Sequence, residues 1–222
     1  TQRRRAVESA RRRPLLWAAA WWIGLGCLAV SAQENGLCLD CHHDPASDME
    51  FDVPAFSGSV HGDLSCIDCH DDLEGMTEDH GAVRRVDCSG CHEDESAAYA
   101  ASEHGRAATN GVPEAAGCAD CHGPPHAMLP AGNTNAPTHF TRIPDTCGRC
   151  HARAEVMARY QPRKQQAVVD YSNSVHGVAL RREGKHAAVC TDCHGTHGIQ
   201  RGTDASSPMH WQRIPATCGT CH

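Results

Sequence analysis

The feature that most constrains this 222-residue chain is a cysteine motif that occurs seven times. Fourteen of the fifteen cysteines stand in pairs with the spacing Cys-x-x-Cys, and a histidine directly follows each pair. The motifs comprise Cys38, Cys41 and His42; Cys66, Cys69 and His70; Cys88, Cys91 and His92; Cys118, Cys121 and His122; Cys147, Cys150 and His151; Cys190, Cys193 and His194; and Cys218, Cys221 and His222. Seven copies do not arise by chance, so one chemical arrangement is repeated along the chain.

The composition supplies too few large apolar side chains for an ordinary core. The chain has three Phe, three Tyr and four Trp, and its mean hydropathy is −0.48. Chains with a poor side-chain core are usually stabilised by disulfides or by a bound metal group. We therefore expect a group other than side chains to fill much of the interior.

Cys-x-x-Cys-His is the attachment sequence of c-type haem. The two thiols bond to the porphyrin, and the adjacent histidine ligates the iron from one face. The sequence thus predicts seven haem c groups, with the seven motif histidines as proximal ligands. We expect a haem-nucleated, mostly irregular chain with short α-helices, two of them at 93–102 and 152–160, and little or no β-sheet.

Other uses of Cys-x-x-Cys explain the chain less well. A structural zinc site needs two such pairs, or one pair with two spaced histidines. Disulfides are compatible with an exported chain, and a thioredoxin-like redox centre uses a single motif. None of these alternatives accounts for seven pairs that are all followed by histidine.

A longer repeat surrounds the motifs. Residues 99–151 and 171–222 share an aromatic residue, a Ser-x-His-Gly sequence, a Cys-x-Asp-Cys-His-Gly motif with a further histidine, and a closing Arg-Ile-Pro-x-Thr-Cys-Gly-x-Cys-His. A shorter copy precedes them, and one single motif stands before that copy. We divide the chain into a signal segment (1–32), an acidic three-haem segment (33–98) and two two-haem repeats (99–170 and 171–222).

Ten histidines outside the motifs are available as second, distal ligands of the seven irons. Repeat-equivalent positions favour six of them as distal ligands: His61, His80, His104, His139, His176 and His210. Three others are either ligands or ordinary histidines: His43, His126 and His197. His186 has no counterpart in the preceding copy, so we read it as an ordinary histidine. Each ligand imidazole needs an orienting hydrogen bond, for which Ser59, Ser102 and Ser174 or backbone carbonyls are the expected partners.

Two histidine ligands leave an iron with no position for substrate. The sequence therefore predicts an electron carrier with mostly bis-histidine haems, and not an enzyme. A reductase of small nitrogen or sulfur oxyanions would need an open iron, often with a Cys-x-x-Cys-Lys motif, which does not occur. A third hypothesis is a subunit of a polymeric haem wire, in which a histidine of one chain ligates a haem of the next.

The N-terminal segment has the layout of a secretory signal peptide. A basic start precedes an apolar run from Leu15 to Val30 and a small-residue exit at Ala32. We expect cleavage after Ala32, with an uncleaved membrane anchor as the alternative. The protein is then exported to the periplasm or the cell exterior, with membrane association left open.

Charge is distributed unevenly along the remaining chain. Residues 33–98 carry 17 Asp and Glu against two Arg, a net charge of −15, whereas residues 99–222 carry a net charge of +3. Such an acidic segment favours a basic protein partner over nucleic acid. A solvated acidic surface without a partner explains the charge equally well.

These motifs resemble those of multihaem cytochrome c families with doubled Cys-x-x-Cys-His sites. The stretch from Cys38 to His43 resembles tetrahaem cytochrome c3, and Tyr171 to His222 resembles modules repeated in long periplasmic cytochromes. The resemblance implies electron transfer between a quinol-oxidising membrane complex and a terminal reductase or an extracellular acceptor. Related chains continue into further repeats, so we also expect the third copy to be truncated and the chain to be a fragment. A homo-oligomer is compatible with this reading.

Overall fold

The computed structural model describes residues 30–42, 51–76, 80–160, 166–183 and 186–222. The signal segment up to residue 29, Cys27 and His43 lie outside the described residues. In the described ranges the secondary structure is entirely helical, with no strand. This confirms the expectation of short helices and irregular chain without a sheet. Haem nucleation remains a prediction.

The helices are short and separated by loops and turns. The α-helices are α1 (Val30–His42), α2 (Val53–Ser57), α3 (Cys66–Cys69), α4 (Glu93–Ala100), α5 (Glu103–Thr109), α6 (Cys118–His122), α7 (Ile143–His151), α8 (Ala154–Tyr160), α9 (Ala167–Asn173), α10 (Val175–Glu183), α11 (Cys190–His194) and α12 (Ile214–Cys218). Three 3₁₀ turns are η1 (Asp71–Leu73), η2 (Cys88–Gly90) and η3 (Pro125–Ala127). The helices expected at 93–102 and 152–160 are confirmed as α4 and α8.

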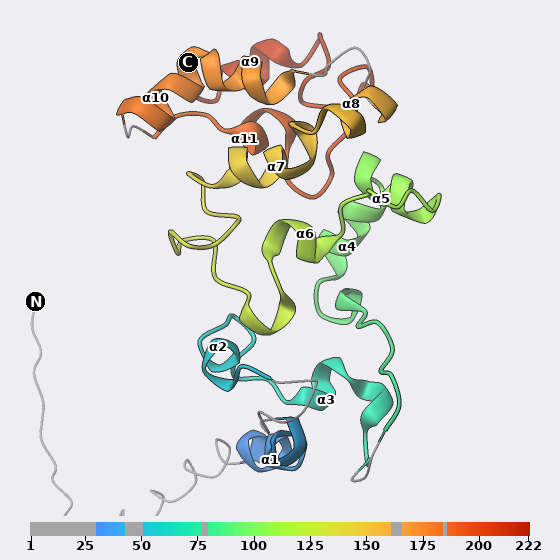
Figure 1. Ribbon diagram of the computed structural model, residues 1–222. Helices are drawn as coiled ribbons and strands as arrows, with labels where there is room; N and C mark the ends of the chain where they lie inside the picture. The colour runs from blue at the N-terminus through green and yellow to red at the C-terminus, as the bar shows by residue number, and fades with distance from the viewer. Residues whose placement is uncertain (1–29, 43–50, 77–79, 161–165, 184–185) are drawn as a thin grey trace, which may run out of the picture.

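The elements follow one another along the molecule in approximate chain order. Figure 1 shows α1, α2 and α3 at one end, α4 to α6 in the middle, and α7 to α11 at the other end. The acidic three-motif segment and the last repeat therefore lie at opposite ends.

Several attachment motifs begin a helix, and the aspartate inside the motif stabilises that start. In three motifs the carboxylate accepts a hydrogen bond, 2.7 Å long, from the backbone N–H just before the first cysteine. The pairs are Asp68 with Ser65, Asp120 with Gly117 and Asp192 with Val189. Such bonds satisfy a backbone donor that the first helical turn leaves free. The aspartate of Cys-x-Asp-Cys therefore has a structural role.

The Ser-x-His-Gly sequence also begins a helix. The buried Ser102 hydroxyl accepts a hydrogen bond from the Gly105 N–H at 3.0 Å, and Ser174 accepts from Gly177 at 3.2 Å. These hydroxyls cap the helix start. In these two copies the serine hydroxyls therefore bond to the backbone N–H of the glycine, whereas the sequence predicts the imidazole as their partner.

Glycine is needed at the end of this sequence because the preceding chain comes very close. A Cβ atom on Gly105 would lie 2.0 Å from the Tyr99 carbonyl oxygen, and one on Gly177 would lie 2.1 Å from the Tyr171 carbonyl. The two tyrosine hydroxyls donate to backbone carbonyls just before the next attachment motif, at 2.9 and 3.0 Å. The shared aromatic residue thus ties its helix to the motif that follows.

Side chains form only a small core. Ile143, Leu180 and Val189 make a buried cluster, against which Cys147 and Cys190 pack. The buried apolar side chains of the described residues all lie between positions 136 and 189. The described part of the acidic segment contributes none of them. This agrees with the composition.

Within the described ranges, no helix is both long enough and apolar enough to cross a membrane.

Candidate functional site

Six pairs of histidines join a motif to a histidine outside the motifs. The ring centres are 5.8 to 6.1 Å apart in the pairs His42–His80, His61–His92, His70–His126, His104–His151, His122–His197 and His176–His222. Two imidazoles that bind one metal ion from opposite sides, each at about 2 Å, have ring centres about 6 Å apart. The separation in all six pairs therefore fits two axial ligands of one iron.

In three of the pairs, both histidines belong to the same copy of the repeat. The histidine of Ser-x-His-Gly lies opposite the histidine of the second motif in its own copy. This holds for His61 with His92, His104 with His151, and His176 with His222. The structure thus brings together residues that the repeat had marked as distal and proximal ligands.

Two pairs connect one copy with the copy before it. His126 lies opposite His70, the first motif histidine of the preceding copy, and His197 lies opposite His122 in the same way. The sequence left the roles of His126 and His197 open. Their common placement shows that each of the last two copies brings a histidine to a motif of the copy before it.

The histidine eight residues before a motif has different neighbours in different copies. His80 lies opposite His42 of the single motif. His139 contacts Phe140, and its Nδ1 is 2.7 Å from the Thr141 hydroxyl, while His210 lies beside Trp211. The ligand roles of His139 and His210 stay predictions. His186 also lies against Phe140, with ring centres 4.5 Å apart.

We call His126 and His197 the connecting histidines. A turn at a glycine precedes each of them and directs the chain toward the previous copy. Gly123 and Gly195 directly follow Cys-His and have φ angles of 91° and 81°, a region that side chains other than glycine rarely adopt. The shorter copy has Asp71 at this place, where the chain enters the turn η1. Its lack of a connecting histidine therefore goes with the lack of this turn.

We call the contact between the first two copies the first joint; it comprises Val60, Met128, His126, Phe51 and Phe56. The Val60 N–H donates to the Met128 carbonyl at 2.9 Å. The rings of Phe51 and Phe56 meet the edge of His126, with centres 4.9 and 6.2 Å away. The side chains of this joint are apolar and aromatic around the connecting histidine.

The second joint connects the last two copies and comprises Glu103, Arg106, Ile199, Gln200 and Arg201. The Glu103 N–H donates to the Ile199 carbonyl at 2.9 Å, the same bond at the equivalent positions. The Glu103 carboxylate pairs with Arg106 and Arg201, and Arg106 also donates to the Gln200 side chain. Burial raises the pKa of Glu103, but the two arginines outweigh it and the net pKa is lowered. Ion pairs between Glu103 and the two arginines therefore connect the side chains of this joint.

The cysteines of consecutive motifs lie close enough to affect one another's titration. At each of the six junctions between successive motifs, a cysteine of one motif raises the pKa of a cysteine in its neighbour: Cys38 with Cys66, Cys69 with Cys91, Cys88 with Cys118, Cys121 with Cys150, Cys147 with Cys190, and Cys193 with Cys218. The seven motifs therefore form one continuous series in space.

Burial affects the titration of the paired histidines and of the motif cysteines. It lowers the pKa of four paired histidines, His104, His122, His126 and His151. The neutral imidazole that results at pH 7 is the form that binds metals. Burial and the neighbouring Cys38 raise the pKa of the Cys66 thiol to about 11.

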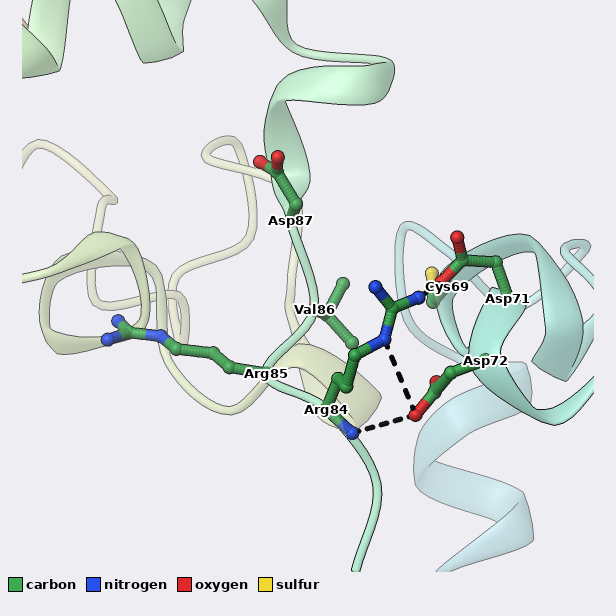
Figure 2. Close-up of a pocket in the computed structure, with 7 residues that line it drawn as sticks. All are labelled: Cys69, Asp71, Asp72, Arg84, Arg85, Val86 and Asp87. Carbon is green, nitrogen blue, oxygen red and sulfur yellow. Dashed lines mark hydrogen bonds and ion pairs between the residues drawn. The ribbon is translucent and has the colours of Figure 1, made fainter.

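Figure 2 shows a pocket next to the second motif. Its volume is about 190 Å³, and it is lined by Cys69, Asp71, Asp72, Arg84, Arg85, Val86 and Asp87. Arg84 crosses it and pairs with Asp71 at 2.8 Å, while its N–H donates to Asp72 at 2.8 Å. That backbone bond is the main cause of the lowered pKa of Asp72. The pocket is smaller than the roughly 300 Å³ of a typical ligand pocket, and two of its lining residues, Arg84 and Asp71, form an ion pair.

The cysteines and histidines are not gathered into larger clusters. No disulfide joins any two of the fourteen motif cysteines. Across the described ranges, no group of three or more His, Cys, Asp or Glu is arranged to hold a metal ion. The recurring unit is a pair of histidines beside a pair of thiols.

No protein-family model matches the chain, and neither a curated protein nor a solved structure is significantly similar to it.

Proposed function

We propose that this chain is a seven-haem c-type cytochrome that carries electrons in the periplasm or outside the cell. The observation that supports this most strongly is the set of six histidine pairs with ring centres 5.8 to 6.1 Å apart. Each pair contains a histidine that directly follows two cysteines. Binding of both histidines of a pair to one iron would explain why this separation recurs.

The residues present fit haem c. Two thiols of each motif would hold the porphyrin covalently, and in six motifs the motif histidine and the histidine paired with it would both bind the iron. Bound haem supplies reversible one-electron chemistry at low potential when both ligands are histidine. The aspartates and serines that cap the helix starts hold these ligands in place.

The chain's own residues favour electron transfer over catalysis. Burial keeps His104, His122, His126 and His151 neutral, which suits them as ligands. When imidazoles take both axial positions, no substrate reaches the metal. The interacting thiols of successive motifs would keep neighbouring cofactors close enough for electrons to pass from one to the next.

Charge suggests where electrons enter or leave. The acidic segment at one end of the molecule (Figure 1) is suited to a basic redox protein. A quinol-oxidising membrane complex at one end and a terminal reductase or extracellular acceptor at the other fit an exported carrier.

Mass spectrometry of the full chain, produced with haem-maturation proteins in an exporting host, tests the proposal. We expect seven haem increments, and six in a Cys218→Ala, Cys221→Ala double variant. A mass without haem increments would contradict the proposal, and the same spectrum shows whether residues 1–32 are removed.

Visible spectra of the oxidised and reduced protein test the absence of substrate chemistry. We expect low-spin haems from the paired sites. A high-spin band that persists in every preparation, together with turnover of nitrite, hydroxylamine or tetrathionate, would favour a reductase instead.

A further inference from the structure

Two of the histidine pairs have the same geometry in different surroundings. We call the pair His61–His92 the third site and the pair His104–His151 the fifth site, after the position of their motifs along the chain. The ring centres are 6.1 and 6.0 Å apart, and the ring planes are inclined at 69° and 68°. Since the ligands and their geometry match, any difference between the two sites comes from the residues around them.

The third site is exposed, and the fifth site is partly buried. All three motif residues of the third site are exposed to solvent: Cys88, Cys91 and His92. The corresponding residues of the fifth site are half-buried: Cys147, Cys150 and His151. The helix α7 that carries them also buries Ile143 and Pro144, and Met157 of α8 is 2% exposed. An apolar surrounding disfavours the oxidised state of a bound haem, which carries one more positive charge, so burial raises the reduction potential of the fifth site.

The two sites also differ in charge. From two residues before the first cysteine to fourteen after it, the third site has four carboxylates and no Lys or Arg: Asp87, Glu93, Asp94 and Glu95. The same stretch of the fifth site has two carboxylates and three arginines. Both of these carboxylates, Asp145 and Glu155, form ion pairs with arginines, at 3.0 and 2.8 Å. None of the four at the third site forms an ion pair with a described residue. Unpaired negative charge stabilises the oxidised state and lowers the potential of the third site.

The two arginines nearest the third site serve its neighbours. Arg84 pairs with Asp71, directly after the second motif, at 2.8 Å. Arg85 extends to the other side of the chain (Figure 2), where its guanidinium lies 3.5 Å from the position that a Cβ on Gly117 would take. Gly117 directly precedes the fourth motif. Neither arginine therefore pairs with a carboxylate of the third site.

We propose that the third site has a lower reduction potential than the fifth site, so that electrons enter at the acidic segment and pass toward the two-haem repeats. This inference rests on the proposed function and adds a direction to it. The donor is a basic one-electron redox protein, which the negative charge around the third site attracts.

The transfer is one electron from site to site. The haem of the third site is oxidised and the haem of the fifth site is reduced, while no bond forms or breaks and no proton moves. The fourth motif connects the two sites, because Cys118 lies near Cys88 and Cys121 lies near Cys150.

Removing one attachment site at a time assigns the potentials. The variant Cys88→Ala, Cys91→Ala lacks the third site, and Cys147→Ala, Cys150→Ala lacks the fifth. Each is compared with the full haem-loaded chain by spectroelectrochemical titration at pH 7, after mass spectrometry has shown six haem increments. We expect the potential lost in the first variant to be more negative than the potential lost in the second. The reverse order overturns the inference.

Removing the charge of α4 tests the cause without touching an attachment site, and it decides the question where an attachment variant fails to mature. The triple variant Glu93→Gln, Asp94→Asn, Glu95→Gln should raise one of the more negative potentials. We expect the reduced-to-oxidised ratio of that haem at a fixed electrode potential to rise about threefold, which is about 28 mV for one electron. Asp170→Asn, at an exposed carboxylate of α9, is the control and should raise none. Potentials that the triple variant leaves unchanged overturn the inference.

Ionic strength and haem content complete the test. Salt screens the exposed carboxylates but not burial, so the difference between the two sites should narrow at high salt and keep its sign. A difference that widens with salt overturns the role of the carboxylates. A chain with seven haems whose third site is not the more negative overturns this inference alone, and a chain without haem overturns the proposed function.

Discussion

The first and second joints both bring a histidine of one copy to a motif of the copy before it, but the first joint is apolar and the second is charged. Both have one backbone hydrogen bond of 2.9 Å, and both place a connecting histidine 5.9 to 6.1 Å from a motif histidine of the preceding copy. Phenylalanines surround the first joint, while a glutamate with two arginines holds the second. The same backbone bond therefore accompanies the same spacing of paired histidines in both joints, whereas the side chains around it differ.

The largest effect is expected from replacing the connecting histidines with methionine. His126→Met and His197→Met should each raise the potential of one haem by about 0.2 V, or about 5 kcal/mol for one electron, because methionine ligation favours reduced iron. Spectroelectrochemical titration measures the shift. If the joints are equivalent, each variant raises the reduction potential of one haem by the same amount, and His186→Met raises none. An unchanged potential in either variant would show that the joints are not equivalent.

Replacing the glycine after the distal histidine should distinguish the two joints by stability. In Gly105→Ala the new Cβ would lie 2.0 Å from a backbone oxygen, whereas in Gly62→Ala the closest distance is 2.6 Å. We expect the thermal midpoint to fall more in Gly105→Ala, by the equivalent of about 3 kcal/mol, than in Gly62→Ala. Gly132→Ala, which meets no atom within 4 Å, is the control. Equal midpoints in all three variants would show that the close approach does not matter.

Removing these serine hydroxyls gives a smaller difference. Ser102 is fully buried and caps the helix at Gly105, while Ser59 is half-buried and accepts from the His61 N–H at 3.2 Å within a turn. Ser102→Ala should cost about 1 kcal/mol, and Ser59→Ala should cost less. Thermal unfolding followed at the haem absorption band measures both. A larger loss in Ser59→Ala would contradict the assignment of the stronger cap to the second joint.

The smallest effect separates the joints by ionic strength. Arg201→Gln removes an exposed ion pair to Glu103, so we expect a loss of about 0.5 kcal/mol at low salt that disappears in high salt. Val60→Ala in the first joint should change stability equally at both salt concentrations. A salt-dependent effect of Val60→Ala would show that the first joint is not apolar.

Much of the fold was visible in the sequence because the attachment motifs and the helix at Glu93 are local patterns. The pairing of His126 with His70 was not, because these residues are 56 positions apart and only the folded chain brings them together. A local sign was present nevertheless. The glycine of Cys-His-Gly occurs in the two copies whose loops turn back, and Asp71 replaces it in the copy without such a loop.

Two sets of residues with similar sequence patterns have different surroundings in the structure. Ser102 and Ser174 looked like partners of the adjacent imidazoles, but a hydroxyl at a helix start is closer to a free backbone N–H. His80, His139 and His210 share one spacing to a motif, yet only the chain of the shorter copy brings its histidine to the single motif at His42. Equal spacing did not mean equal surroundings.

The connection of each copy to the next also determines an order of assembly. A ribosome releases the N-terminal copy first, but the site at His70 lacks its opposite histidine until His126 has followed. The site at His122 waits in the same way for His197. Maturation would therefore trail synthesis by about one repeat, and each copy would be completed by the arrival of its neighbour.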